Sequence, residues 1–409
     1  MKEIATVSSA NAEACTGNCS GCGKTHIKIF GHHNAAERRL AERVHAALQT
    51  AGIDGKVLEI SDPVALQAHG VRTLPALMVE GEIVLQGLIP SVPALVRLLK
   101  NKGLYKSKLY RLRTISVPVD MSEVSANALI YAWHLAQRLD SQLEIVYAMD
   151  SIFEGTTPSS TGFLSGYTQT MHTELDTFVT ETMAMVGVQY VSPARFAGGP
   201  GQTTTNEETQ PRIHSKVIYG APDVALADYS RNTDLIVMGA TGRGGIGKKL
   251  FGSVSVEVSR NAHCPVLFVP KEASYRGLSN LLYASDFDSL NTLCVQQAAA
   301  FAQRFDGQIH FVHVGPGGEK NLEEQRARFE ADFGESVSNR PFVFSKMVSD
   351  DISGALYEYA FYHRIDLLVF VTHHRNFWDN LLHKSVTNEV VAGSDLPILV
   401  IHSDDDLLP

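Results

Sequence analysis

The sequence predicts an α/β protein with one small N-terminal α/β domain followed by two doubly wound parallel-sheet domains. Three observations support this fold class. Apolar runs of four to six residues alternate with segments of helical periodicity, which is the pattern of parallel strands buried between helices. Residues 114–149 resemble residues 280–315, so the doubly wound part occurs twice. The first hundred residues lie outside that repeat and carry their own strand and helix pattern.

The composition is typical of a soluble globular protein with several cores. The chain of 409 residues is too long for one ordinary hydrophobic core. A composition of 44% hydrophobic and 19% charged residues excludes a disordered chain. A formal net charge of −9 without a long basic block argues against nucleic acid or an anionic membrane as a partner. No apolar stretch reaches the roughly 18 residues of a membrane helix. Residues 1–15 lack the apolar core of a secretory signal, so we expect a cytoplasmic protein.

The N-terminal segment has the pattern strand, helix, strand, hairpin, helix. This order, with Pro75 before the third strand, resembles the small thioredoxin-like redox-disulfide proteins. The resemblance implies a thioredoxin-like domain over 26–104 with a cis Pro75. That family's Cys-x-x-Cys is missing, because Asn34-Ala-Ala-Glu37 occupies the matching positions, so we expect a degenerate domain. The expected elements are 26–31, 35–50, 56–61, 71–87 and 91–100.

Three cysteines lie in residues 1–25, which we expect to form a Cys-rich tail. Cys15, Cys19, Cys22 and His26 have the residue types of a zinc or iron–sulfur site. Cys19 and Cys22 alone form a Cys-x-x-Cys, which suits a redox pair. A flexible tail with reactive thiols explains the same residues. The sequence leaves these three interpretations open.

Each copy of the repeat has the order strand, helix, strand, a variable middle, and then helix, strand, helix, strand. The first helix, 125–139, carries Trp133 on its apolar stripe, so we expect this side chain in the core. The longer middle of the first copy predicts surface loops around a helix near 171–185, with a lid over a ligand as the alternative. The strands expected in the first copy are 115–119, 143–147, 235–238 and 266–269.

A glycine-rich stretch follows the third of these strands. Gly239, Gly242, Gly252 and Ser253 have the spacing Gly-x2-Gly-x9-Gly-(Ser/Thr), while 242–247 also satisfies the dinucleotide fingerprint. The context favours a mononucleotide, because a dinucleotide fingerprint normally opens its domain and Gly252 interrupts the place of its helix. Glycines let the backbone approach a phosphate, and a helix that begins at Ser253 offers free N–H groups to an anion.

With these residues the repeat resembles the universal stress protein family. The resemblance implies a nucleotide-binding domain over 110–270 and a degenerate one over 278–403, both of the adenine nucleotide α-hydrolase-like fold. It implies ATP, accompanied by Mg²⁺, as the ligand. The family's aspartate after the first strand contacts the nucleoside, a role carried here to Asp120. The site residues expected are Pro118, Asp120, Ala148, Gly239, Gly242, Arg243, Gly252, Ser253 and Val254.

The second copy departs from the nucleotide motif. Val371, His374 and Lys384 replace the three motif glycines, and only Ser385 and Asp286 remain. The close backbone approach to a phosphate is lost with the glycines. We therefore expect this copy not to bind ATP in the same way.

The sequence favours a nucleotide-responsive stress protein that acts as a binding module. No general base for ATP hydrolysis is identifiable, so no enzyme activity is assigned, and slow hydrolysis stays open. The alternative is a redox or metal-handling protein that uses the N-terminal cysteines, with the tandem domains as a scaffold. The final strands, 264–270 and 396–402, are apolar edges, so we expect the two copies to pair within the chain, with a homodimer as a further assembly.

Overall fold

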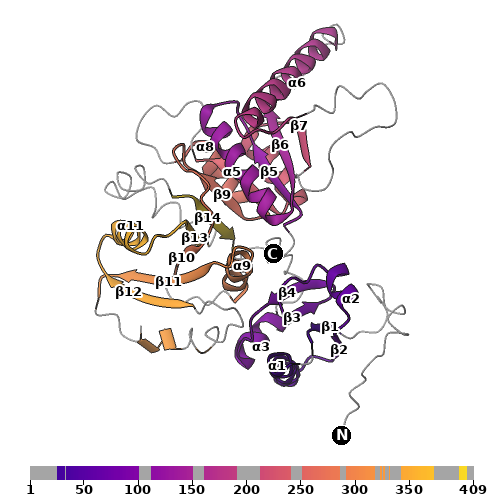
Figure 1. Ribbon diagram of the computed structural model, residues 1–409, viewed down its shortest axis with the longest axis vertical. Coiled ribbons are helices and arrows are strands. Elements are labelled where there is room, and N and C mark those ends of the chain that lie inside the picture. The colour runs from indigo at the N-terminus through magenta and orange to yellow at the C-terminus, as the bar shows by residue number, and fades with distance from the viewer. Residues whose placement is uncertain are drawn as a thin grey trace. The chain divides into compact units, whose positions relative to one another are not determined.

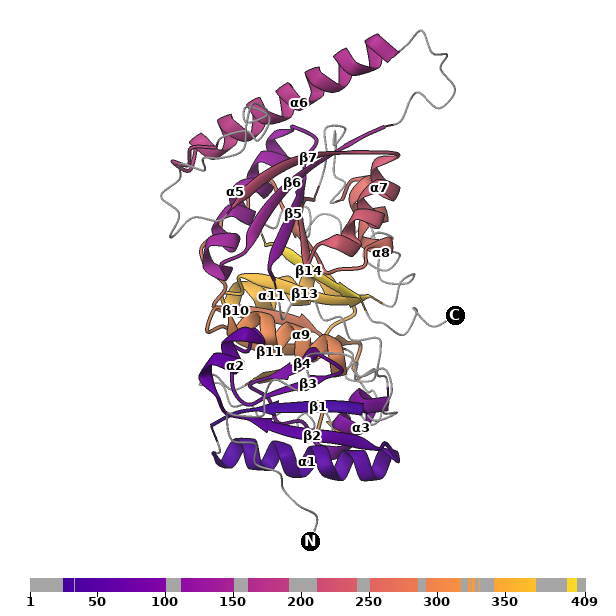
Figure 2. The same ribbon diagram turned by 90° about the vertical axis from the view of Figure 1, so that its right-hand side faces the viewer.

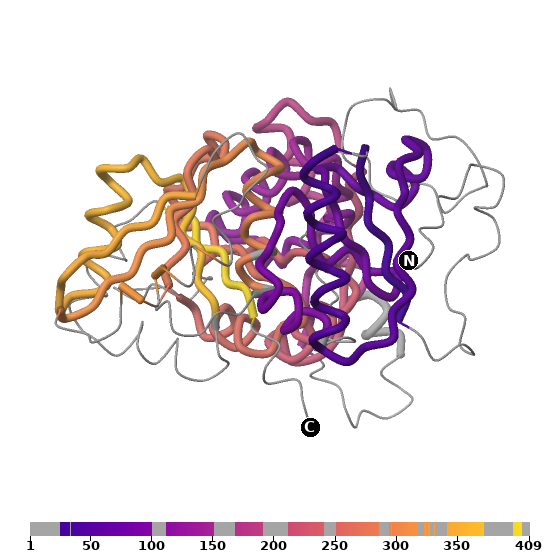
Figure 3. The backbone as a smooth tube through the Cα atoms, turned by 90° about the horizontal axis from the view of Figure 1, so that it is seen from below, coloured from indigo at the N-terminus to yellow at the C-terminus, as the bar shows by residue number. Residues whose placement is uncertain are grey.

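The computed structural model describes most of the chain, and residues outside the described ranges are grey in Figure 3. The described residues fall into two compact units, whose helices and strands are labelled in Figure 1. The first unit joins the N-terminal domain to Leu278–Ile352, and the second joins Leu112–Gly277 to Ser353–His402. The described ranges are 25–32, 34–100, 112–150, 161–190, 212–240, 251–285, 292–317, 342–372 and 396–402, with short pieces between 323 and 331.

The N-terminal domain is a four-stranded sheet in the order β2-β1-β3-β4. β1 pairs in parallel with β2 and antiparallel with β3, and β3 pairs antiparallel with β4. The Leu74–Pro75 peptide bond is cis, as the sequence resemblance implies. The elements are β1 (Thr25–Phe30), α1 (Ala35–Ala51), β2 (Gly55–Ile60), α2 (Pro63–Ala68), β3 (Ala76–Val79), β4 (Glu82–Gln86) and α3 (Val92–Lys100).

The start of α1 occupies the position of the missing Cys-x-x-Cys. The Asn34 side chain accepts a hydrogen bond from the Glu37 N–H at 3.0 Å and so caps the helix. The helix ends at Gly52, whose φ of 67° is the left-handed conformation that glycine adopts without strain. Its apolar stripe, which includes Leu40 and Val44, is buried. Cap and stripe together explain why this segment is helical without the thiols of the related proteins.

Helix α2 was not predicted from the sequence. It is a short helix with Pro63 at its first position, and the Asp62 side chain accepts a hydrogen bond from the Val64 N–H at 3.2 Å. An aspartate followed by proline is a recognised helix start. The signal was therefore present in the sequence, although the helix is only 6 residues long.

The second unit contains a doubly wound sheet. Strands β9, β8, β5, β6 and β7 follow one another in that order with parallel neighbours. Figure 2 shows α5 and α6 on one face of these strands and α7 and α8 on the other. Trp133 of α5 is 2% exposed, which confirms its place in the core. The elements are β5 (Thr114–Pro118), α5 (Glu123–Leu139), β6 (Gln142–Met149), α6 (Thr161–Ala184), β7 (Ile213–Tyr219), α7 (Pro222–Tyr229), β8 (Leu235–Gly239), α8 (Ser253–Asn261) and β9 (Val266–Val269).

Helix α6 starts well before the predicted position near residue 171. Gly162 and Gly166 lie in the added part of the helix, where each lowers helix propensity by about 1 kcal/mol relative to alanine. That cost predicted a loop, yet the helix continues through both glycines. Of the loops predicted on either side, 155–166 and 196–211, residues 161–166 are helical, and the remaining residues lie outside the described part of the chain.

Strand β7 was not predicted, because its sequence is not a continuous apolar run. His214 and Lys216 are exposed and alternate with half-buried neighbours, as in a strand at a sheet edge. A polar network attaches the strand to α6. The Tyr190 hydroxyl donates to Ser215 Oγ at 2.8 Å, and Ser215 Oγ donates to Asp176 Oδ1 at 3.1 Å.

The C-terminal strand β14 (Ile398–His402) also belongs to the second unit. It pairs in parallel with β13 (Leu367–Thr372), which α11 (Ile352–Tyr362) precedes, and antiparallel with β9. In the antiparallel register Leu399 lies opposite Leu267, and both side chains are 0% exposed. The last strands of the two repeats are thus hydrogen-bonded neighbours within this unit.

The remaining strands of the second repeat lie in the first unit. β10 (Asn280–Ala284), β11 (Gln308–Gly315) and β12 (Val343–Val348) are parallel in the order β12-β11-β10. Helix α9 (Thr292–Gln303) connects β10 to β11. Among the helices that the structure describes, none has the length and apolarity needed to cross a bilayer.

The register between β9 and β14 predicts the effect of a charge at its centre. Leu399→Asp should lower the free energy of unfolding of the second unit by at least about 3 kcal/mol, because it buries a carboxylate without a partner. The matched control is Ser274→Asp at an exposed position. Denaturant unfolding compares the two variants, and equal midpoints would contradict the pairing.

Candidate functional site

The carboxyl ends of β5, β6 and β8 meet at one edge of the sheet. β5 is the parallel neighbour of both β6 and β8, so the three strands end on the same side. Pro118 ends β5 and Gly239 ends β8, while Ala148 stands one residue before the end of β6. Ligands of open parallel sheets bind beyond such an edge. This edge is therefore the candidate functional site.

Asp120 lies in the turn between β5 and α5. Its Oδ1 atom accepts hydrogen bonds from the Ser122 N–H at 3.1 Å and the Ser122 hydroxyl at 2.6 Å. Met121 between them has a φ of 60°, which a residue other than glycine rarely adopts. Ser122 also caps α5 in a capping box with Ser125. The half-buried Asp120 carboxylate is thus held in one orientation at the sheet edge.

The start of α8 is held against the end of β8. The Gly252 N–H donates to the Ala240 carbonyl at 2.9 Å, and the Ser255 hydroxyl donates to the Gly239 carbonyl at 3.2 Å. Phe251 is 4% exposed and packs edge-to-face on Phe268 with ring centroids 5.0 Å apart. These contacts bring the first turn of α8 to the same edge as Asp120.

Among the described residues, no side chain caps the N-terminus of α8. Its N-cap residue is Gly252, and no described side chain accepts a hydrogen bond from this end of the helix. The first N–H groups of a helix have no intrahelical acceptor, and the helix dipole makes this end favourable for an anion. Ser253 is exposed and Val254 half-buried, so both residues are accessible. This end of α8 has the donors that a phosphate group requires.

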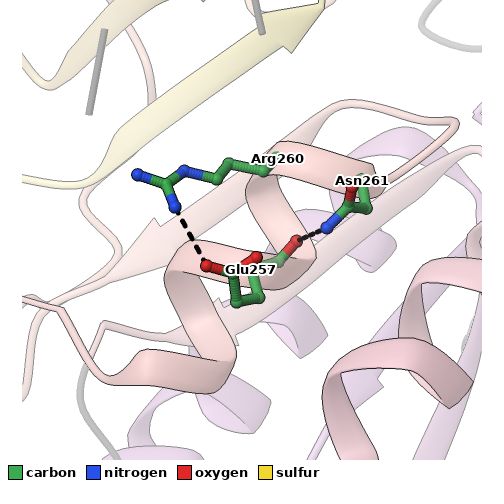
Figure 4. Close-up of polar contacts among 3 residues, drawn as sticks. All are labelled: Glu257, Arg260 and Asn261. Carbon is green, nitrogen blue, oxygen red and sulfur yellow. Dashed lines mark hydrogen bonds and ion pairs between the residues drawn. The ribbon is translucent and has the colours of Figure 1, made fainter. Parts of the chain in front are cut away.

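The C-terminal half of α8 is held by contacts of its own. Arg260 Nη1 donates to Glu257 Oε1 at 3.0 Å, and Asn261 Nδ2 donates to the Glu257 carbonyl at 2.9 Å (Figure 4). Both Arg260 and Glu257 are partly exposed, so this ion pair contributes little to stability. Neither of these hydrogen bonds involves the first N–H groups of α8.

Two serines that orient residues at this edge, Ser122 and Ser255, were not predicted from the sequence. A serine before Glu123 and the apolar stripe of α5 is a helix-start signal, so the sequence could have predicted the role of Ser122. No sequence signal indicates Ser255, because its acceptor, the Gly239 carbonyl, belongs to the preceding strand.

A cluster of three polar side chains connects β5, β6 and α7 away from this edge. The Tyr229 hydroxyl donates to Glu144 Oε2 at 2.6 Å, and the Ser116 hydroxyl lies 3.4 Å from the same oxygen. Burial, followed by the hydrogen bond to Glu144, raises the pKa of Tyr229. The tyrosine therefore stays protonated as a donor, and the group attaches α7 to the sheet.

Some of the expected site residues lie outside the described part of the chain. These are Gly242 and Arg243. The counterparts Asp286, His374, Lys384 and Ser385 in the second copy also lie outside it. Val371, the counterpart of Gly239, lies within β13 and pairs with Ile401.

The expected metal or redox residues are also mostly outside the described part. Cys15, Cys19 and Cys22 lie outside it, so the redox or metal-handling alternative stays a prediction from the sequence. His26 lies within β1, and its backbone N–H donates to Glu80 Oε1 at 3.0 Å. Among the described residues no group of three or more histidine, cysteine or acidic side chains could hold a metal ion.

Known proteins match the chain in the same segments. The model of the universal stress protein family matches residues 111–270 and 278–402, and that of a thioredoxin domain matches residues 25–100. A universal stress protein of Methanocaldococcus jannaschii is 29% identical over 162 residues, which are 39% of this chain and 82% of that protein. One of Mycobacterium tuberculosis is 39% identical over 64 residues, 16% of this chain and 22% of that protein.

A solved structure supports the same fold. The crystal structure of a universal stress protein from Archaeoglobus fulgidus has a TM-score of 0.50 and 17% sequence identity to this chain. The likeness covers 74% of this chain and 100% of that one. The two chains thus share the doubly wound architecture described above.

The capping role of Ser122, in the turn that holds Asp120, predicts how substitutions at this position change the free energy of unfolding. Ser122→Ala should lower the free energy of unfolding by about 1 kcal/mol, because it removes the cap of α5. Ser122→Thr retains a hydroxyl and should remain close to the wild-type protein. Thermal unfolding of the variants measures the difference, and equal losses for alanine and threonine would exclude the capping role.

Proposed function

The chain belongs to the universal stress protein family, and on that premise we propose that its first copy, over 110–270, is an ATP-binding regulatory module. The main support is the uncapped N-terminus of α8, held beside the end of β8 by the Gly252 and Ser255 hydrogen bonds. The oriented Asp120 carboxylate follows the neighbouring strand. A donor-rich end and a carboxylate at one sheet edge suit a ligand that carries both phosphates and hydroxyl groups.

The phosphate end of the ligand would bind at α8. The N–H groups of Ser253 and Val254 and the Ser253 hydroxyl are hydrogen-bond donors suited to phosphate oxygens. Gly242 and Arg243 complete the family motif in the sequence and would contribute close backbone approach and positive charge. A Mg²⁺ ion that accompanies ATP would neutralise part of the phosphate charge.

The nucleoside end would bind near Asp120. An ionised carboxylate only accepts hydrogen bonds, so it suits the ribose hydroxyls or the exocyclic amino group of adenine. Pro118 and Ala148, near the ends of β5 and β6, would provide apolar contact for the base. Ser122 positions the carboxylate for this role through its two hydrogen bonds.

We further propose that the two stress-protein copies pair within one chain, with the second copy as a partner that does not bind ATP. The antiparallel register of β9 and β14 supports the pairing. The loss of three motif glycines supports a second copy without an ATP site. ATP in the first copy would then bias a neighbour that has no ligand of its own, which is how a regulatory module acts.

ATP and inorganic tripolyphosphate together test the two ends of the proposed site separately. Ser253→Ala should weaken both ATP and inorganic tripolyphosphate about tenfold, because it removes a hydrogen bond to a charged group. Asp120→Asn should weaken ATP alone, since tripolyphosphate has no nucleoside. Isothermal titration calorimetry with Mg²⁺ measures both affinities and should give one ATP site per chain.

Matched controls complete the calorimetry. Ser274→Ala changes an exposed serine outside the family motif, and Ser385→Ala changes the counterpart of Ser253 in the second copy. Neither substitution should affect ATP binding. Two equivalent ATP sites per chain, or a Ser253→Ala variant that binds both ligands normally, would sink the proposal.

A further inference from the structure

Helix α9 of the second stress-protein copy has apolar residues buried around most of its circumference. Such a helix is expected only where it is covered on several sides. α9 contacts β11 of its own repeat and also β4 and α3 of the N-terminal domain, all within the first unit. Figures 1 and 2 both show it next to β4. The buried residues of α9 include Cys294, Val295, Ala298, Ala299, Ala300, Phe301 and Ala302.

The N-terminal domain meets α9 with one face of its sheet. The opposite face carries Ile27, beside Leu48 of α1. The face toward α9, which we call the open sheet face, consists of the side chains that form a buried cluster with Ala300. An apolar sheet face has to be covered, and the short helix α2 contributes only Leu66 to this cluster. The open sheet face comprises Phe30, Ala76, Met78 and Ile83, and Leu66 of α2 packs in the same cluster.

The internal repeat shows how this contact changes the environment of α9. Gln303 and Arg304 correspond to Gln137 and Arg138 of the first copy. Both residues of the first copy are exposed, whereas both residues of the second copy are half-buried. Burial and the positive charge of Arg72 lower the pKa of Arg304 to about 10. The N-terminal domain thus covers a helix surface that faces solvent in the other copy.

Gln303 fits this contact poorly. Its Nε2 and Oε1 atoms are buried and have no hydrogen-bond partner among the described residues. The amide lies against Gly87 and Thr73, since a Cβ atom built on Gly87 would be 2.7 Å from Gln303 Nε2 and 2.8 Å from Thr73 Cγ2. A buried amide without a partner destabilises the docked state relative to a state in which water reaches it.

We propose that the open sheet face is a docking surface whose occupant is α9 of the same chain, and that Gln303 makes this docking reversible. The apolar cluster around Ala300 favours the docked state, and the unsatisfied Gln303 amide favours release. The N-terminal domain is then a latch on the second copy, which opens without unfolding of either part. This function needs neither a Cys-x-x-Cys at α1 nor ATP at α8, so it stands apart from the nucleotide proposal.

Thiol alkylation measures the opening of the latch. An Ala76→Cys variant places a thiol on the open sheet face, where Ala76 is 0% exposed. Mass spectrometry locates the label. A matched Ala47→Cys variant, at a position of α1 that is also 0% exposed, reports unfolding of the N-terminal domain itself. We expect alkylation at position 76 at least tenfold faster than at position 47. Equal rates at the two positions would overturn the proposal, because opening would then require unfolding.

A second substitution tests Gln303 directly. In the Ala76→Cys background, Gln303→Leu should slow alkylation at position 76 about tenfold, since it removes a penalty of about 1.4 kcal/mol from the docked state. Gln137→Leu makes the same change at the exposed counterpart in the first copy and should leave the rate unchanged. The proposal would also be overturned if Gln303→Leu left the alkylation rate at position 76 unchanged. The same holds if Gln137→Leu slowed alkylation as much as Gln303→Leu does.

Discussion

The hydrogen bond from the Gly252 N–H to the Ala240 carbonyl determines where the candidate nucleotide site is built. It returns the chain to the end of β8 after the glycine-rich stretch, and the Ser255 hydroxyl bond to Gly239 secures the same junction. α8 therefore begins at the sheet edge, with its free N–H groups on the side where parallel strands end. Asp120 reaches this edge through a different constraint, the turn that Ser122 closes.

The two repeats differ in their motif residues and in the burial of their first helix. The first copy combines the full glycine motif with an oriented aspartate and an uncapped helix. The second copy has lost the motif glycines, and its first helix, α9, is covered on the surface that corresponds to exposed Gln137 and Arg138. In the proposed function the second copy binds no ATP and therefore needs no accessible site there. The same helix surface then becomes available for a contact within the chain.

The N-terminal domain retains the fold of its relatives without their thiols at α1. Its cis Leu74–Pro75 bond and its strand order match the expected domain, while Asn34 caps α1 where a cysteine pair would stand. Ala300 joins the cluster of Phe30, Met78 and their neighbours. The sheet thus obtains cover on its second face from a distant part of the chain.

The sequence by itself determined the fold class, the repeat, the burial of Trp133 and the start of α8 at Gly252-Ser253. These features depend on local periodicity, caps and glycine spacing, which neighbouring residues carry. Only the tertiary structure decided that β7 is a strand, that Ser255 bonds to Gly239, and that Gln303 is buried while Gln137 is exposed. Each of these depends on residues distant in sequence, such as Asp176 for β7 or Gly87 for Gln303. Identical residue types at equivalent helix positions differ in burial because another domain covers only one of them.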